Sequence, residues 1–190
     1  KKKVLYIHHG WGIGGAPISL LNLILNLDRK IYEPIVLFTH KSEAIDLFKN
    51  EGIETLIETK YNKYFQHNKN GKLKFYNIYS TIIIFRNWLM IGYRIAPKIY
   101  SEINPDIIHL NSYVLSSWAF GARSFNIPVV CHNREPISKG TLGIRYNFIR
   151  YILTKFVNTV ISISKDNLNR LDISNCILIY NPVAQSFYQK

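Results

Sequence analysis

Four glycines stand close together near the start of the chain, in the stretch HHGWGIGG at residues 8–15. The run from Gly10 to Gly15 satisfies the G-x-G-x-x-G pattern of dinucleotide-binding proteins, and Pro17 suits the first turn of a helix behind it. Glycines let a backbone approach a ligand closely, and the start of a helix favours an anion such as phosphate. We therefore expect the loop to bind a phosphate-bearing ligand. For any single glycine, a role in a tight strand-to-helix turn remains the alternative.

A nicotinamide dinucleotide needs one more group, an acidic residue at the end of the second strand that holds the ribose hydroxyls. That position falls among Thr39, His40 and Lys41, and none of them is acidic. A basic residue there suits at most a 2′-phosphate. The sequence therefore favours a ligand other than NAD.

Polar residues also follow two later strands of the predicted sheet. His109, Asn111 and Ser112 stand at the end of the fourth strand, and His132 and Glu135 at the end of the fifth. In an open parallel sheet, ligands bind beyond the carboxyl ends of the strands, at the switch point between the first and fourth. We expect these side chains to gather there beside the glycine loop.

His132 is the strongest candidate for a catalytic residue, because it ends a buried strand next to the switch point; a purely structural histidine is the alternative. His109 lies within its strand and is predicted to be a buried, hydrogen-bonded core residue. No metal site is predicted, because the six histidines are scattered without ligand spacing. Adjacent Cys131 and His132 should point to opposite faces, which excludes a Cys–His nucleophilic pair. No G-x-S-x-G elbow of a hydrolase occurs.

Short apolar runs alternate with longer helical stretches along the chain, which indicates a parallel sheet with helices on both faces. Near-continuous apolar runs such as VLYI and PIVLF are typical of strands buried on both faces. The predicted class is an α/β, doubly wound (Rossmann-like) parallel sheet of about seven strands. The predicted strands are Val4–His8, Pro34–Thr39, Ile53–Glu58, Asp106–Leu110, Pro128–His132, Thr159–Ile163 and Cys176–Tyr180. The predicted helices are Pro17–Leu27, Glu43–Asn50, Phe75–Ile103, Tyr113–Phe125, Leu142–Phe156 and Lys165–Leu171.

Composition narrows the possible partners and the compartment. The 190 residues suffice for one domain, and 47% of them are hydrophobic, so a packed globule is expected. The formal net charge of +12 favours a polyanionic partner, which can be a phosphate-bearing ligand, an anionic membrane face or nucleic acid. Cys131 and Cys176 make no disulfide framework, so a reducing cytosol is expected.

Residues 59–101 contain no Asp or Glu and carry eight Lys or Arg. Their most apolar part is interrupted by Arg86, Asn87 and Arg94, so we expect no membrane span. We predict instead that residues Lys60–Lys74 and the outer face of the next helix lie on an anionic membrane. The rings assigned to the bilayer surface are those of Tyr61, Tyr64, Phe65 and Trp88. The side chains predicted to pack that helix on the sheet, from their helical spacing, are Ile78, Ile82, Phe85 and Leu89.

Taken in order, these features resemble the N-terminal half of a GT-B glycosyltransferase of the large family 4 of retaining enzymes. GIGGA at residues 12–16 is similar to the family's glycine-rich loop, and NPDIIHLN at residues 104–111 resembles its PDIVHxH strand, with Asn111 in place of the second histidine. PVVCH at residues 128–132 resembles the fifth strand that ends in a functional histidine, and ISISK at residues 161–165 resembles the VSxS strand and helix. The motif NPV, starting at Asn181, stands where the family has NGV.

The resemblance implies a division of the chain. Residues 1–183 would be the N-terminal, Rossmann-like, acceptor-binding domain, and residues 184–190 an exit segment toward a C-terminal donor-binding domain. Together the two halves of the GT-B fold would transfer a sugar from a nucleotide-sugar to a glycan or lipid-linked acceptor, in bacterial cell-surface polysaccharide biosynthesis. The nucleotide-sugar is the donor substrate, and no metal or other cofactor is implied. The implied location is the cytoplasm, peripherally at the inner face of the cell membrane, without a nucleic-acid partner.

The same resemblance implies roles for single residues. His132 would lie against the sugar or acceptor at the reacting centre. The backbone that would approach the donor phosphates belongs to Gly12, Gly14, Gly15 and Ala16, and the acceptor side would be lined by Asn111, Ser112 and Glu135. Two alternatives remain: an NAD(P)-dependent oxidoreductase-type nucleotide-binding domain, and a basic nucleic-acid-binding module that would also explain the +12 charge.

Overall fold

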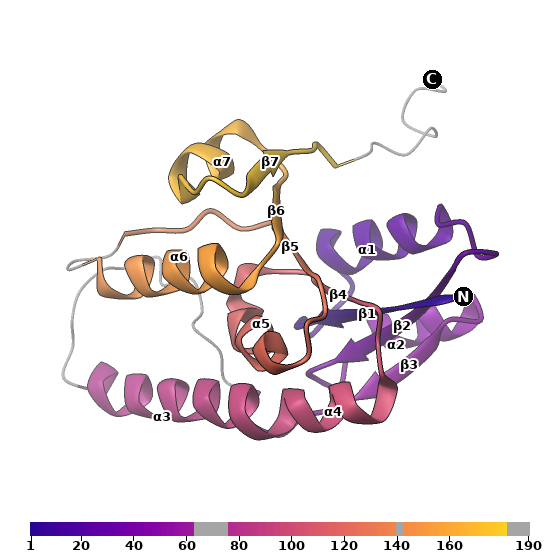
Figure 1. The fold of residues 1–190 in the computed structure, drawn as a ribbon, viewed down its shortest axis with the longest axis horizontal. Helices are drawn as coiled ribbons and strands as arrows, with labels where there is room; N and C mark the ends of the chain where they lie inside the picture. Colours follow the sequence, from indigo (N-terminus) through magenta and orange to yellow (C-terminus); the bar gives the residue numbers. More distant parts are fainter. Residues whose placement is uncertain (63–75, 140–142, 182–190) are drawn as a thin grey trace.

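Seven parallel strands form one sheet in the order β3-β2-β1-β4-β5-β6-β7 (Figure 1). The computed structural model describes residues 1–62, 76–139 and 143–181. Chain order runs outward from β1 toward one edge and from β4 toward the other, so the switch point lies between these two strands. The strands are β1 (Lys2–His8), β2 (Tyr32–Phe38), β3 (Glu54–Ile57), β4 (Ile107–Leu110), β5 (Val129–Asn133), β6 (Thr159–Ser162) and β7 (Cys176–Leu178). The prediction of a doubly wound parallel sheet is confirmed.

Helices connect the strands as predicted, although two predicted helices are subdivided. The stretch predicted as one helix over 75–103 is α-helical at both ends with a π-helical turn between them, and the stretch over 113–125 is three short pieces. The helices are α1 (Gly15–Leu25), α2 (Ala44–Asn50), α3 (Tyr76–Met90), η1 (Ile91–Ile95), α4 (Ala96–Ile103), η2 (Tyr113–Leu115), α5 (Ser116–Gly121), η3 (Ala122–Ser124), α6 (Ile144–Phe156) and α7 (Lys165–Leu171).

Alternate residues of β1 and β2 enter two separate cores, one on each face of the sheet. In β1, Val4 and Tyr6 pack with α1 and α2, whereas Leu5 and Ile7 pack with α4, α5 and α6. All four side chains are buried, which explains why the strand reads as a continuous apolar run. Figure 1 shows α1 and the long α3–α4 helix on different sides of the strands.

A pair of glycines lets the long helix lie directly against α5. A Cβ atom on Gly92 would lie 2.6 Å from Phe120 Cδ1, and one on Gly121 would lie 2.5 Å from Ala96 Cβ. The π-helical turn at η1 contains Gly92, whose carbonyl oxygen accepts a hydrogen bond of 3.2 Å from Arg123 Nη1. Larger side chains at either glycine would push α5 away from the long helix.

The face of α3 that packs inward differs from the predicted one. Ile82 is 61% exposed and Phe85 46% exposed, so the prediction that these two residues pack on the sheet is wrong. Trp88 is buried instead, which also corrects its predicted place at a bilayer surface. Its Nε1 donates a 3.2 Å hydrogen bond to Ser116 Oγ, and its ring contacts Phe120 and Phe148. Because α3 is apolar on more than one side, spacing alone does not determine which side packs inward. The side that carries Trp88 faces α5 and α6.

Most of the basic segment assigned to a membrane lies outside the described residues, including Lys69, Lys72 and Lys74. Within the described parts of the chain, no helix has the length and apolar character needed to cross a bilayer.

Candidate functional site

The strand ends on both sides of the switch point bring together most of the residues singled out in the sequence. β1 ends at His8, β4 is followed by Asn111 and Ser112, and β5 places His132 and Asn133 at its end. All of these side chains are buried. Because β1, β4 and β5 are neighbours in one parallel sheet, their carboxyl ends form one continuous edge.

His109 and His132 form a hydrogen-bonded pair on this edge. His109 Nε2 lies 2.8 Å from His132 Nδ1, and the His109 ring also packs 4.9 Å from the ring of Tyr6. Burial and the nearby Arg134 charge lower the pKa of His132 to about 3, and burial lowers the pKa of His109 as well. Both rings are therefore neutral at pH 7, so one donates and the other accepts the hydrogen bond between them. His109 is buried and hydrogen-bonded, as predicted.

Asn111 links the glycine loop to the fifth strand. Its Nδ2 donates to His8 Nδ1 at 3.0 Å and to the carbonyl oxygen of Ala16 at 3.3 Å. Its Oδ1 accepts a 2.8 Å hydrogen bond from Arg134 Nε. Asn111 therefore orients other groups through both its Nδ2 and its Oδ1.

Ser112 and Glu135 also meet, as a buried hydroxyl beside a partly exposed carboxylate. Ser112 Oγ donates to Glu135 Oε2 at 2.6 Å and accepts from Val114 N at 3.3 Å. Ser112 is fully buried, whereas the Glu135 side chain is 34% exposed and its Oε1 lies 4.0 Å from His9 Nε2. Burial raises the pKa of Glu135 and lowers that of His9 to about 4. A ligand would meet the carboxylate, and Ser112 would act by positioning it.

The glycine loop follows β1 and opens α1. Gly12, Gly14 and Gly15 have no atom within 4 Å of the position a Cβ would take, and none of them has a positive φ. Neither packing nor backbone conformation in the described structure thus requires glycine at these three positions. A close approach by a ligand would require it. Trp11 in the same loop is 67% exposed and lies 4.2 Å from the ring of His40.

The same edge bears on two other kinds of site, one for a nicotinamide dinucleotide and one for a metal ion. The end of β2 carries Thr39 and His40, whose Oγ1 and Nδ1 atoms lie 3.1 Å apart, and no acidic residue stands there to bind a ribose. Across the described residues, no group of three or more His, Cys, Asp or Glu side chains is arranged to hold a metal ion.

Arg134 is the residue of this edge that the sequence analysis did not assign to the site. Its Nη1 donates to Ser19 Oγ and to Asn181 Oδ1, each at 2.9 Å, so that one side chain joins α1, the end of β4 and the end of β7. The signal available in the sequence was an arginine directly behind a buried strand at the switch point. Asn181, the first residue of the NPV motif, is part of the same network.

The sheet order and the helices on both faces are those of one half of a GT-B fold. HepE from Anabaena, solved with UDP and glucose, has a TM-score of 0.69 and 16% sequence identity over 99% of this chain and 46% of that chain. MurG from Acinetobacter baumannii has a TM-score of 0.54 and 18% identity over 87% of this chain and 42% of that chain. A putative UDP-N-acetylglucosamine 2-epimerase from Listeria monocytogenes has a TM-score of 0.56 and 12% identity over 93% and 44%.

At these identities the likeness establishes the fold alone. The chain spans about half the length of the structures that it matches. No protein-family model matches the sequence, and no curated protein does.

Proposed function

We propose that this chain is the acceptor-binding, N-terminal half of a bacterial glycosyltransferase of the retaining family 4 type. The observation that carries the proposal is the cluster at the switch point, where the His109–His132 pair, Glu135 and an unobstructed glycine loop share one edge of a GT-B half domain. HepE, which has the same fold, was solved with UDP-glucose. The donor would accordingly be a nucleotide-sugar and the acceptor a glycan or lipid-linked glycan of the cell surface.

The roles follow from the geometry of the edge. His132 uses Nδ1 in the bond to His109, so its Nε2 is the ring atom left for a sugar or acceptor hydroxyl. Because the ring is neutral, it acts as a hydrogen-bonding group and contributes no charge. Glu135 would accept from an acceptor hydroxyl, and the backbone at Gly14 and Gly15 would approach the donor phosphates. No metal or cofactor beyond the donor enters this scheme.

Catalysis in a cleft needs both of its walls, so residues 1–183 would depend on a C-terminal donor-binding domain beyond residues 184–190. The test is sugar transfer from a panel of nucleotide-sugars, by the 190-residue chain and by the chain joined to a second domain. We expect the 190-residue chain to fold and show no turnover, and the joined protein to transfer sugar. Enzyme-like turnover by the 190-residue chain would contradict the division, and NADPH quenching of Trp11 fluorescence with hydride transfer would favour the oxidoreductase.

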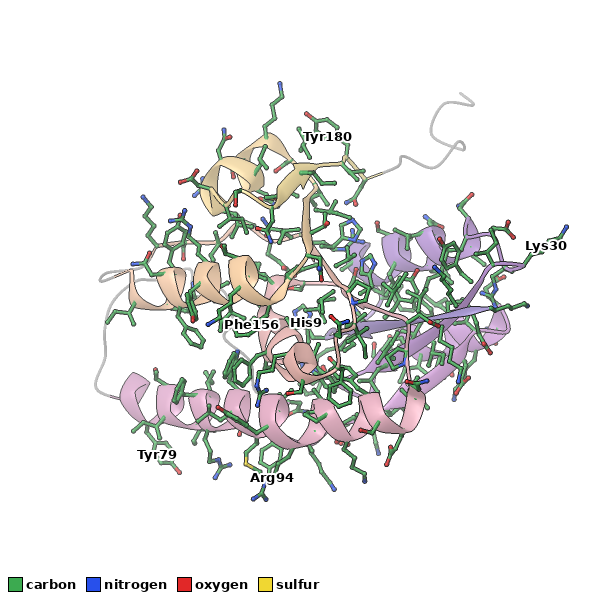
Figure 2. All side chains as sticks on the ribbon, viewed as in Figure 1. His9, Lys30, Tyr79, Arg94, Phe156 and Tyr180 are labelled. Carbon is green, nitrogen blue, oxygen red and sulfur yellow. The ribbon has the colours of Figure 1, made fainter. Side chains whose placement is uncertain are left out.

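A second part of the proposal is a peripheral position on the inner face of the cell membrane. Exposed apolar side chains lie on α3 and on α6, two helices that touch through the rings of Phe85 and Phe148. We call these the α3–α6 surface: Tyr79, Ile82, Phe85, Ile144 and Tyr151. Figure 2 shows Tyr79 and Arg94 pointing away from the molecule along the outer side of the long helix.

The charge around this surface is one-sided. Residues 59–101 and 136–165 contain no Asp or Glu, and they supply α3 and α6. Exposed apolar groups among cations are what an anionic bilayer surface attracts, at about 1 kcal/mol for each basic residue near it. A lipid-linked acceptor would make this position useful. Nucleic acid would be attracted by the charges, whereas the exposed aliphatic groups favour lipid.

A further inference from the structure

Arg134 is a partly buried cation whose described hydrogen-bond partners are all uncharged. Its guanidinium donates to three side-chain oxygens, which belong to Ser19, Asn111 and Asn181. None of the ion pairs of the described structure includes it. None of its described hydrogen bonds uses Nη2, which leaves two N–H donors of the fork for another group. Burial lowers the pKa of Arg134, and the neighbouring Glu135 carboxylate opposes this shift but makes no ion pair with Arg134 in the described structure, so the fork remains able to pair with an anion.

The hydrogen bonds around Arg134 fix the orientation of a second donor. Because Arg134 Nε must donate to Asn111 Oδ1, Asn111 Nδ2 faces His8 and donates to His8 Nδ1. Neutral His8 then carries its proton on Nε2. This Nε2 is buried, has no hydrogen-bond partner among the described residues, and lies 2.6 Å from the position of a Gly10 Cβ. The His8 Nε2–H donor therefore has no acceptor among the described residues and lies against Gly10, the first glycine of the loop.

The start of α1 completes the arrangement. Gly14 caps this 11-residue helix without a side-chain hydrogen bond, and the first turn contains no acidic residue. Ala16, in that turn, is connected to Arg134 by two hydrogen bonds through Asn111. The guanidinium is thus connected through Asn111 to the start of the helix, whose positive end favours an anion, and the His8 N–H lies against Gly10 of the same loop.

We propose that Arg134, with His8 and the start of α1, forms a binding site for a phosphate or diphosphate group. This site deepens the proposed function and rests on it for the source of the ligand, which is either the diphosphate of a nucleotide donor or the phosphate of a lipid-linked acceptor. In the first case Arg134 meets the leaving group from the acceptor domain. In the second it selects acceptors that carry phosphate.

Binding of inorganic diphosphate to the 190-residue chain at low ionic strength tests the site, measured by ³¹P line broadening and by the shift in melting temperature. We expect binding, and a dissociation constant at least about tenfold higher for Arg134→Gln, because a charge-assisted pair is lost. Arg123→Gln is the matched control: Arg123 also donates only to uncharged oxygens, lies at α5 and η3 away from this edge, and should bind within about twofold of the wild type. Arg134→Lys, which keeps the charge and loses the fork, should bind with intermediate affinity.

A role as a structural clamp makes a different forecast. Arg134→Gln would then lower the melting temperature without ligand and bind diphosphate as Arg123→Gln does. That result, or no binding of diphosphate by the folded wild type, overturns the proposal. If Arg134→Gln does not fold, the proposal is tested by diphosphate binding to the wild type and to Arg134→Lys, which should bind more weakly than the wild type.

Two pairs of ligands distinguish a donor from an acceptor as the source of the phosphate. Tighter binding of UDP than of uridine indicates a donor site, and tighter binding of geranyl diphosphate than of geraniol indicates an acceptor site. In either case the two dissociation constants should become equal in Arg134→Gln. Failure of the proposed function is distinguishable, because a joined two-domain protein without sugar transfer would leave diphosphate binding by this chain intact.

Discussion

The carboxyl edge of the sheet and the α3–α6 surface reverse the usual distribution of side chains in opposite ways. At the edge, polar side chains are buried and histidines are kept neutral, since burial lowers the pKa of every histidine of the described chain; these are His8, His9, His40, His109 and His132. On the α3–α6 surface, apolar side chains are exposed, and so are the cations Arg86 of α3, Lys155 of α6 and Arg94 of the adjoining η1.

The net charge of +12 alone does not distinguish attraction to an anionic membrane from binding of an anionic ligand, and the two regions assign these roles to different places. Most of the positive charge lies outside the edge, where it acts at long range and is screened by salt. The edge works at hydrogen-bond distance, with Arg134 as its partly buried cation. Substitutions at the edge should therefore alter turnover or the pH dependence of stability, and substitutions on the α3–α6 surface should alter binding to membranes.

The largest effect is expected from His132→Ala in the two-domain protein. Removal of the ring takes away His132 Nε2, the His132 ring atom that the bond to His109 leaves for the substrate. Turnover should fall by about 100-fold or more, as is typical for loss of a preorganised polar group. Steady-state kinetics and the melting temperature are measured on the same samples. A variant with normal specific activity and a lowered melting temperature would mean that His132 is purely structural.

Much of this edge was predictable because topology alone brings the ends of β1, β4 and β5 together. β1 and β2 are buried on both faces and are continuous apolar runs, and all seven predicted strands are present in the sheet. β7 is shorter than predicted, ending at Leu178, because this edge strand pairs with β6 alone.

What escaped prediction depends on contacts between distant segments. The His109–His132 bond requires the register in which His109 pairs with Val130, and no local pattern encodes that register. Arg134 binds residues 23, 47 and 115 positions away. The side of α3 that packs inward was decided by Trp88 and its partners on α5 and α6, not by the spacing of Ile82 and Phe85.

The second prediction concerns acid. His8 and His132 have pKa values near 3 in the folded protein, against an ordinary value of 6.5. Between these pH values the unfolded chain binds one more proton per ring, so the free energy of unfolding falls as pH falls, by about 1.4 kcal/mol per pH unit for each ring. The full contribution is present above pH 6.5, and at pH 5 the two rings together have lost about 4 kcal/mol.

Denaturant unfolding at a series of pH values between neutral and pH 5 measures this loss. His132→Asn should flatten the dependence by about 1.4 kcal/mol per pH unit, because one titrating ring is gone. Equal pH dependence in the variant and the wild type would mean that His132 takes up its proton in the fold.

The third prediction sharpens the other side of the comparison. Arg86→Glu with Arg94→Glu should weaken sedimentation with phosphatidylglycerol vesicles by about tenfold or more, since each basic residue near an anionic surface contributes about 1 kcal/mol. Arg29→Glu with Lys30→Glu changes the charge equally at the far end of the molecule, where Figure 2 places Lys30, and should have a smaller effect. Replacement of Lys69, Lys72 and Lys74 by glutamate should also weaken binding. Equal binding to phosphatidylcholine vesicles, or none to either, would end the membrane proposal.

The smallest effect is expected from Ile82→Ser. With 61% of this side chain exposed, the substitution should change the free energy of unfolding by less than about 0.5 kcal/mol, whereas Ile91→Ser, at a fully buried position of the same long helix, should cost several times more. Vesicle binding by Ile82→Ser should fall about three- to fivefold, because one aliphatic group no longer enters the bilayer surface. Ile31→Ser is the matched control, since Ile31 is 51% exposed just before β2 and lies outside the α3–α6 surface. If Ile31→Ser and Ile82→Ser bind vesicles equally well, exposure of Ile82 has no part in membrane binding, and the cations alone must account for any attraction to lipid.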